Sequence, residues 1–269
     1  MKHTQFMVKP GSKVDLKGID PGDTRPYKAA EEIQEKLGHK LEHIARMQER
    51  LYAEGKQALL VIFQGMDTSG KDGATKSVLR EVNPQGVTVT PFKVPSKEEL
   101  AHEFLWRVVQ KVPPKGQIGI FNRSHYEEVL VVRVHDLVPE AVWSARFDQI
   151  NSFEKRLAET YVRVVKVFLH ISKDEQKRRL TDRLADKEKH WKFNPDDLKE
   201  RALWKEYREA YEDVLSKCST KWAPWYIVPA DHKWYRNLAV AEIIEDALDD
   251  MDPKFPKPTF DPALVKIDS

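Results

Sequence analysis

The segment that most constrains the fold is a run of apolar residues, 58–63, that passes directly into a glycine-rich loop. A short continuous apolar run is typical of a strand buried on both faces of a parallel sheet. In the loop, Gly65, Gly70 and Lys71 have the spacing G-x-x-x-x-G-K, and the segment after them has helical character. Glycines at this spacing let backbone N–H groups converge on a phosphate, which the helix N-terminus and the lysine also attract. The sequence therefore predicts a phosphate-binding loop (P-loop) rather than an ordinary glycine turn, which would rarely fall at a strand–helix junction.

Strand and helix patterns alternate along the rest of the chain. Further strands are predicted at residues 87–92, 116–121, 164–171 and 225–228. Helices are predicted at residues 28–53, 74–82, 96–109, 124–137, 141–161, 173–186, 195–217 and 240–248. Such alternation favours an α/β fold in which helices cover both faces of a five-stranded parallel sheet.

The chain is expected to divide into three parts. Residues 1–56 should form an arm and a helix packed on the core, residues 57–251 the P-loop domain, and residues 252–269 a proline-rich tail. The net charge of +2 does not indicate general affinity for nucleic acid, and the single cysteine, Cys218, fits a reducing compartment. No apolar run approaches the roughly 20 residues of a membrane span, and the first residues lack the apolar core of a secretory signal. We therefore expect a cytoplasmic enzyme with no membrane partner.

Two carboxylates make this P-loop unusual. Asp72 follows Lys71, where a serine or threonine usually supplies a hydroxyl to Mg²⁺, and Asp67 lies inside the loop. Two acids beside a phosphate site would repel a bare anion, so they favour a divalent metal between them and the phosphates. Asp72 has an alternative role as a helix cap in the first turn, which Asp67 does not share.

Polar residues gather where the third predicted strand ends. In open parallel sheets ligands bind at the carboxyl ends of the strands, and here the chain continues from Asn122 through Glu128. Arg123 suits bidentate phosphate binding, and Asn122 and Glu127 suit the positioning of a metal or an acceptor. Glu127 has an alternative role, since it stands three residues after Ser124 and would complete a capping box with it.

At this point the chain resembles the polyphosphate kinase 2 family. The matching stretches are spread from about residue 50 to residue 240, which is most of the chain, and their order and number make the resemblance more specific than a P-loop alone. They are residues 65–73 (GMDTSGKDG), 102–107 (HEFLWR), 121–126 (FNRSHY), 151–154 (NSFE), 168–176 (FLHISKDEQ) and 223–230 (APWYIVPA).

The resemblance implies a thymidylate-kinase-like core of three α/β/α layers with a helical lid at about residues 173–217. It also implies reversible phosphoryl transfer between inorganic polyphosphate and adenine nucleotides, from AMP to ADP and from ADP to ATP. Mg²⁺ is the expected cofactor, with Mn²⁺ as an alternative ion. The expected partners are polyphosphate, AMP, ADP and ATP, together with further copies of the chain in a dimer or tetramer.

The same resemblance implies roles for individual residues. The catalytic set would be Asp67, Lys71, Arg123, Glu127 and Arg178, with Lys71 on the transferred phosphate and the two arginines on phosphate charge. Metal would be held by Asp67, Asp72 and Glu127, and the acceptor by Asp67, Asn122, Arg123 and Glu127. The loop residues expected to bind phosphate are Gly65, Met66, Thr68, Ser69, Gly70, Lys71, Asp72 and Gly73.

A long polyphosphate donor carries about one negative charge per unit and so needs a basic track. The candidates are Lys76, Arg80, Arg133, Arg178, Arg179 and Arg183, with Lys187, Lys189 and Lys192 beyond them. The alternative for each lysine is that it simply faces water on a charged helix.

The chain departs from the commonest family pattern at three positions. Many members have aspartate in place of Asn122, tryptophan in place of His125 and asparagine in place of Glu127. The carboxylate is thus moved from position 122 to 127, a combination that resembles the class III subgroup, which accepts both AMP and ADP. The departure puts in doubt which residue orients the acceptor phosphate, and Glu127 is the one we expect.

Two other functions remain open from the sequence. An ATP-dependent nucleotide monophosphate kinase would share the fold and the loop, although Asp72 argues against it. An inactive module that binds polyphosphate or nucleotide is the second alternative, and Asn122 is its best argument.

Overall fold

The protein is built around a five-stranded sheet in which every neighbouring pair of strands is parallel. The computed structural model describes residues 4–265 and 267, and the strand order is β2-β3-β1-β4-β5. The strands are β1 (Ala58–Gln64), β2 (Val87–Pro91), β3 (Ile118–Asn122), β4 (Val162–His170) and β5 (Trp225–Pro229). All five strands expected from the sequence are present, so the prediction of a parallel sheet is confirmed.

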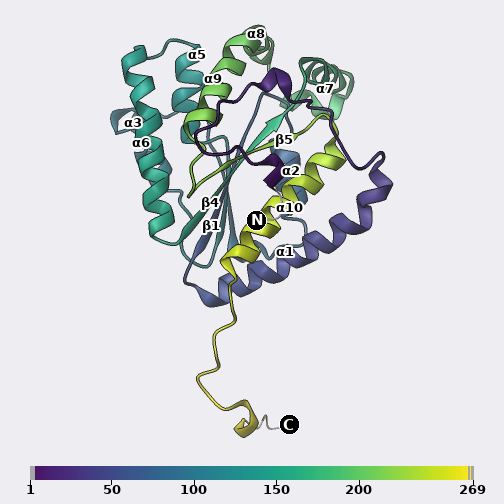
Figure 1. Ribbon diagram of the computed structural model, residues 1–269, viewed down its shortest axis with the longest axis vertical. Helices are drawn as coiled ribbons and strands as arrows, with labels where there is room; N and C mark the ends of the chain where they lie inside the picture. The colour runs from purple at the N-terminus through teal and green to yellow at the C-terminus, as the bar shows by residue number, and fades with distance from the viewer. Residues whose placement is uncertain (1–3, 266, 268–269) are drawn as a thin grey trace.

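Helices cover both faces of this sheet. On one face α10 packs against α1 and α2, and on the other α6 packs on β4, so that the sheet lies between two helical layers (Figure 1). The helices are α1 (Gln34–Glu54), α2 (Lys71–Val78), α3 (Lys97–Ala101), α4 (Trp106–Val109), α5 (Val131–Val134), α6 (Glu140–Glu159), α7 (Lys173–Ala185), α8 (Asp196–Ala202), α9 (Trp204–Lys217) and α10 (Lys233–Met251). The predicted three-layer α/β/α architecture is confirmed.

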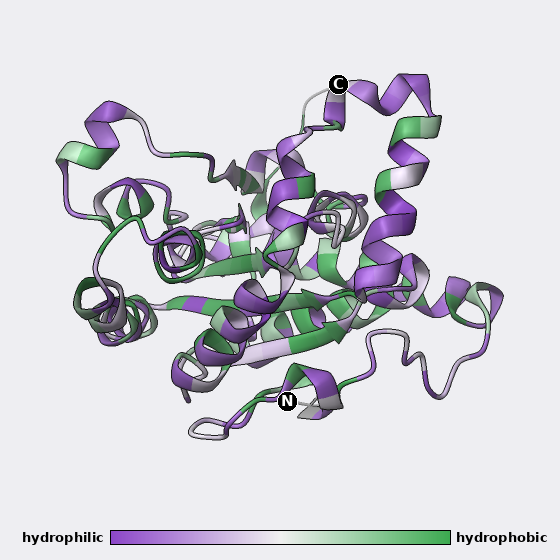
Figure 2. Ribbon diagram, turned by 90° about the horizontal axis from the view of Figure 1, so that it is seen from above, coloured by the Kyte–Doolittle hydropathy of each residue, from purple (hydrophilic) through white to green (hydrophobic). Residues whose placement is uncertain are grey.

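The central strand β1 is buried over its whole length. Its apolar run is continuous rather than alternating because helices exclude water from both faces. Figure 2 shows the same arrangement, with largely hydrophobic strands between helices that carry much hydrophilic surface. Burial of each large aliphatic side chain contributes roughly 1.5–3 kcal/mol, so this strand holds the start of the P-loop in a fixed place.

Three predicted helices are not continuous, and those predictions were wrong in detail. Residues 96–109 form two short helices, because His102 has extended backbone angles and ends α3. Residues 124–137 begin with a 3-10 turn, His125–Val129, before α5. The third, 195–217, is divided at Leu203 into α8 and α9. Apolar periodicity identifies the buried face of a segment, but it does not reveal where the helix is interrupted.

The N-terminal arm covers the outer edge of β5. The backbone N–H of Val8 donates to the carbonyl oxygen of Trp225 (2.8 Å), and Met7 forms an antiparallel bridge with Tyr226. An uncovered edge strand presents unpaired backbone groups to other chains, and the arm occupies these. At the other end of the chain, residues 252–265 extend away from the body (Figure 1). Within residues 4–265 and 267, no helix combines the length and the apolar character needed to cross a membrane.

Candidate active site

The P-loop connects the end of β1 to the start of α2. Gly65 and Gly70 have φ angles of 150° and 100°, which residues with a side chain rarely adopt. A Cβ atom on Gly65 would also lie 2.7 Å from the carbonyl oxygen of Leu169. Both glycines are therefore required by the backbone, and the loop predicted from the sequence is formed between the expected strand and helix.

Lys71 lies folded back into this loop. Its Nζ donates to the carbonyl oxygens of Gly65 (2.7 Å) and Met66 (3.3 Å), and only 9% of the residue is exposed. Burial, followed by the neighbouring charge of Arg123, lowers the pKa of Lys71 to about 8. A phosphate bound in the loop would offset both effects, so the ammonium group is placed to stabilise an anion.

Arg123 joins the P-loop to the segment that follows β3. It has a left-handed φ of 60°, and its backbone N–H donates to the carbonyl oxygen of Phe63 (3.0 Å). Its guanidinium donates to Asp67 (2.7 Å), and the nearest carboxylate oxygen of Glu127 is 3.7 Å away. The charges of Glu127 and then Asp67 raise the pKa of Arg123 against the opposing effect of burial. These three side chains therefore form one charged cluster.

Asp72 and Asn122 form a second link between the loop and β3. The amide nitrogen of Asn122 donates to Asp72 Oδ1 at 2.5 Å. The two loop acids thus each have a partner from the end of β3. In the part of the chain that the structure describes, no three His, Cys, Asp or Glu side chains are grouped as a ready-made metal site. A metal held here would need oxygen ligands from a bound phosphate as well.

A cavity of about 790 Å³ opens over the P-loop. It brings together residues from the loop, from the end of β3, from the predicted lid and from α10. Of the residues predicted from the sequence, its lining includes Asp67, Thr68, Gly70, Lys71, Asp72, Gly73, Asn122, Arg123, Arg179, Arg183, Lys189 and Lys192. The buried hydroxyls of Thr68 and Ser69 have no hydrogen-bond partner among the described residues, and of the two residues only Thr68 lines the cavity.

Several predicted residues lie elsewhere. Lys76 is exposed on α2, and Arg80 is exposed in the turn that follows it, where it pairs with Glu81 (3.0 Å). Arg178 is exposed and pairs with Glu175 and Asp182. None of these cations lines the cavity over the loop, and their expected contacts with phosphate stay predictions.

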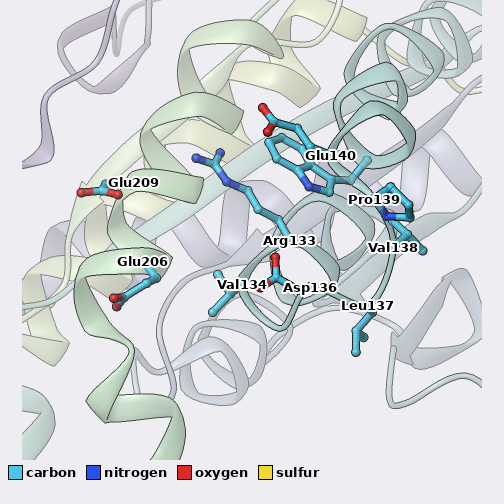
Figure 3. A pocket seen from close by; sticks show the side chains of 10 residues that line it. Arg133, Val134, Asp136, Leu137, Val138, Pro139, Glu140, Glu206 and Glu209 are labelled. Carbon is cyan, nitrogen blue, oxygen red and sulfur yellow. The ribbon is translucent and has the colours of Figure 1, made fainter.

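Arg133 lines a different cavity, of about 570 Å³, between α5, α6 and α9. Its guanidinium pairs with Asp213 (2.6 Å) and lies over the ring of Trp143. Figure 3 shows Arg133 in this cavity together with Glu206 and Glu209 of α9. The two cavities have no lining residue in common, so a phosphate role for Arg133 stays a prediction that this arrangement does not favour.

The start of the predicted lid is bonded to the P-loop through Arg179. Its guanidinium donates to the carbonyl oxygens of Thr68 (2.8 Å) and Ser69 (3.0 Å), and on the other side to those of Ala230 (2.5 Å) and Asp231 (3.0 Å). These bonds occupy most of the donors of Arg179. Its main role in this arrangement is to hold the loop, the end of β5 and α7 together.

Ser124 caps the turn after β3, but the capping box considered for Glu127 is absent. The hydroxyl of Ser124 accepts from the backbone N–H of Tyr126 (3.2 Å), and the carboxylate of Glu127 is instead near Arg123. The turn is a 3-10 turn, in which the spacing of the capping box does not apply. Glu127 is therefore free of the helix-capping role.

A buried polar cluster lies beneath this turn. Lys166 of β4 pairs with Glu154 of α6 at 2.5 Å, and both side chains are fully buried. Glu154 also accepts from the hydroxyl of Tyr126 (2.8 Å) and lies 3.2 Å from His125 Nε2. Burial alone would raise the pKa of Glu154, but Lys166 and His125 hold it below its usual range. The cluster fixes the turn that carries Arg123 and Glu127.

Lys233 and Arg236 also line the cavity over the P-loop, although the sequence did not predict them as site residues. Both lie in the first turn of α10, upstream of the helix predicted at 240–248. They follow β5 by a few residues, so the rule that ligands bind at the carboxyl ends of parallel strands was the one signal that pointed to them.

Comparison with known proteins agrees with this geometry. The family model described as polyphosphate kinase 2 matches residues 27–256. The chain belongs to the polyphosphate kinase 2 family. It is 48% identical to the AMP/ADP-polyphosphate phosphotransferase of Meiothermus ruber, over 94% of this chain and 96% of that protein. It is 44% identical to the ADP-polyphosphate phosphotransferase of Rhodopseudomonas palustris, over 96% of this chain and 94% of the relative.

A solved structure of the same family has the same fold. The crystal structure of polyphosphate kinase 2 from Arthrobacter aurescens superposes with a TM-score of 0.92 at 44% identity, over 95% of this chain and 92% of that one. The family and the kinase-like α/β/α fold expected from the motifs are thus confirmed.

Proposed function

We propose that this protein transfers phosphoryl groups reversibly between inorganic polyphosphate and adenine nucleotides, converting AMP to ADP and ADP to ATP. The observation that carries the proposal is the cavity over the P-loop. Its lining combines Lys71 and other cations with the loop carboxylates of Asp67 and Asp72. It also includes Arg123, which pairs with Asp67. The names of the end-to-end relatives support polyphosphate as donor and both AMP and ADP as acceptors.

In this mechanism the protein positions two phosphates and stabilises charge. Phosphoryl transfer needs in-line placement of donor and acceptor oxygens and stabilisation of the moving group, with little covalent participation by the enzyme. The P-loop amides, the N-terminus of α2 and Lys71 would bind the donor phosphate. Arg123 would bind the acceptor phosphate from the β3 side. Asp67 and Glu127 would orient the Arg123 guanidinium for this contact. The attacking oxygen belongs to a phosphate and is already deprotonated at neutral pH, so no strong general base is required.

The residues present fit Mg²⁺, with Mn²⁺ as an alternative ion. Mg²⁺ is usually bound by one or two carboxylates together with substrate phosphates and water, and Asp67 and Asp72 offer that donor set beside Lys71. Glu127 is the third candidate. When bound, the ion would neutralise charge on the phosphates. Asn122 would orient Asp72 through its amide hydrogen bond.

The lid would enclose the cavity during transfer. Arg183, Lys189 and Lys192 line its lid side and would attract the polyphosphate chain, while closure over the loop would exclude water and limit hydrolysis. Arg178 lies just outside and would reach phosphate only after exchanging its carboxylate partners. We further propose that the enzyme works in the cytoplasm as a homodimer or homotetramer, which measurement of its mass in solution by light scattering would test.

The decisive experiment supplies AMP or ADP with Mg²⁺ and either polyphosphate or ATP. We expect ADP and ATP to form from polyphosphate, and a chelator to stop the reaction. Formation of product from ATP alone would favour a nucleotide monophosphate kinase. Absence of turnover with either donor, unchanged in a Lys71→Ala variant, would favour an inactive binding module.

A further inference from the structure

Arg236 is a buried arginine beside the P-loop that has no acidic partner among the described residues. It lies in the first turn of α10 and is 4% exposed. Its side chain donates only to the neighbouring amide oxygen of Asn237, from Nε (3.2 Å) and Nη2 (2.7 Å). Burial of a charge is costly unless an opposite charge compensates it. The buried guanidinium of Arg236 therefore indicates that a bound anion, rather than a side chain of the protein, compensates its charge.

The guanidinium is packed directly onto the loop glycines. A Cβ atom built on Gly70 would lie 1.9 Å from Arg236 Nη1, and one on Gly73 would lie 3.0 Å from Nη2. Residues three apart share one face of a helix, so this face of α2 is turned toward α10, whereas Asp72 is turned toward Asn122 of β3. Arg236 thus reaches the P-loop from a different side than the acceptor residues.

Other cations surround Arg236. Burial and then the charge of Arg179 lower the pKa of Arg236 to about 10. Burial also lowers the pKa of Lys233, and Arg179, Arg178 and Arg236 lower it further. The acid that acts on Lys233 is Glu175, which two arginines already share. The α10 side of the cavity therefore has more positive charge than its carboxylates balance.

We propose that Arg236 and Lys233 form a phosphate subsite on the α10 side of the P-loop, which binds the part of the polyphosphate donor beyond the phosphate held by Lys71. The inference rests on the proposed function, and it names where the donor chain leaves the loop. All three cations line the same cavity. A polyphosphate chain that leaves the loop on this side moves away from Asp67, Asp72 and Glu127, which would repel it. It also gives the buried guanidinium of Arg236 a phosphate partner for charge-assisted, bidentate hydrogen bonds.

The test is calorimetric titration of the protein with tripolyphosphate and Mg²⁺, without nucleotide, and separately with AMP. We expect Arg236→Met to weaken tripolyphosphate binding about tenfold or more, because hydrogen bonds between charged groups are among the stronger ones, and to leave AMP binding unchanged. Lys233→Met should weaken tripolyphosphate binding less, because Lys233 is exposed whereas Arg236 is buried. The matched control is Arg163→Met: Arg163 also contacts α10, but it has an acidic partner, Asp250 (3.2 Å), and its removal should leave both affinities unchanged.

Thermal unfolding provides a second readout that a structural role would not produce. Removal of an uncompensated buried cation should leave the melting temperature without anion unchanged or higher, and should reduce the stabilisation that tripolyphosphate gives. Wild-type tripolyphosphate affinity in Arg236→Met, or an equal loss of AMP affinity, would overturn the inference. If that variant does not fold, Arg236→Lys should bind tripolyphosphate more weakly than wild type, and wild-type affinity in both Arg236→Lys and Lys233→Met would overturn it.

These experiments distinguish an error in the proposed subsite from an error in the proposed function. A wild-type protein that binds tripolyphosphate through Arg236 but never phosphorylates AMP or ADP would contradict the proposed function and support the subsite. Normal turnover with unchanged tripolyphosphate affinity in both methionine variants would contradict the subsite alone.

Discussion

Replacement of Lys166 by methionine should destabilise the protein by about 3–5 kcal/mol, the usual cost of breaking a buried ion pair by removing one partner. Lys166 Nζ donates to Glu154 (2.5 Å), the hydroxyl of Tyr126 (2.8 Å) and the carbonyl oxygen of Cys218 (2.6 Å), with no exposure to solvent. The variant leaves the carboxylate of Glu154 buried without its cation. Urea unfolding at pH 7 measures the loss directly.

The double variant Glu154→Leu/Lys166→Met separates the ion pair from simple loss of packing. With both charges removed, we expect most of the stability to return. A deficit of about 1–3 kcal/mol should remain, because Tyr126 and the carbonyl group of Cys218 lose a buried hydrogen-bond partner. The reasoning would be refuted if the single variant lost less than about 1 kcal/mol, or if the double variant were as unstable as the sum of the two single variants.

The pH dependence of the single variant has a definite sign. In the wild type the pKa of Glu154 is held below its ordinary value of 4.5. The stability that this contributes is present above 4.5 and is lost as the pH falls through the folded-state pKa. In Lys166→Met burial raises the pKa instead, so the penalty grows from pH 4.5 upward. The difference between wild type and variant should therefore shrink as the pH is lowered from 7 toward 4.5, and a constant difference would contradict this account.

Three further predictions concern the site itself. Lys71→Met should lower kcat by about 100-fold or more, which is the usual effect of losing a preorganised transition-state contact. Circular dichroism should show that the variant is folded. A near-normal kcat would show that Lys71 does not take part in the mechanism. Glu127→Gln should lower kcat far more than the melting temperature, whereas a large fall in melting temperature with normal specific activity would indicate a structural role. Gly70→Ala should weaken polyphosphate binding and cost at least about 1 kcal/mol of stability, because its φ is 100° and a Cβ atom would meet Arg236; wild-type values of both would show that the loop adapts.

The sequence predicted the elements whose signals are local. The apolar run of β1 and the glycine spacing after it lie within a few residues of each other, so the strand, the loop and Lys71 all followed from them. Ser96 and Glu99 likewise form the expected capping box. The start of α10 was missed because residues 233–239 carry several polar and aromatic side chains, so the apolar stripe becomes regular only from Val240. Arg236 was lost with that turn.

Other features depend on contacts between distant segments and leave no pattern along the chain. Arg178 and Arg179 are adjacent in the sequence, and the family resemblance favoured the first. The structure shows that Arg179 reaches the P-loop carbonyls while Arg178 faces its own helix and solvent. One residue is a rotation of about 100° on a helix, and only the packing of α7 against the loop decides which of the two arginines faces inward.

The contacts of Asn122 and Glu127 give a physical reason for the presence of an amide at position 122 and an acid at position 127. Asn122 lies 2.5 Å from Asp72, so a carboxylate at position 122 would place two negative charges in contact unless a cation lay between them. The amide removes that repulsion and donates a hydrogen bond to Asp72. Glu127 supplies the missing carboxylate on the other side of Arg123, where the guanidinium compensates it without metal. The departures at positions 122 and 127 therefore act together: they keep one acid beside Arg123, where we propose that the acceptor phosphate binds, and they leave both loop acids with a partner from the end of β3.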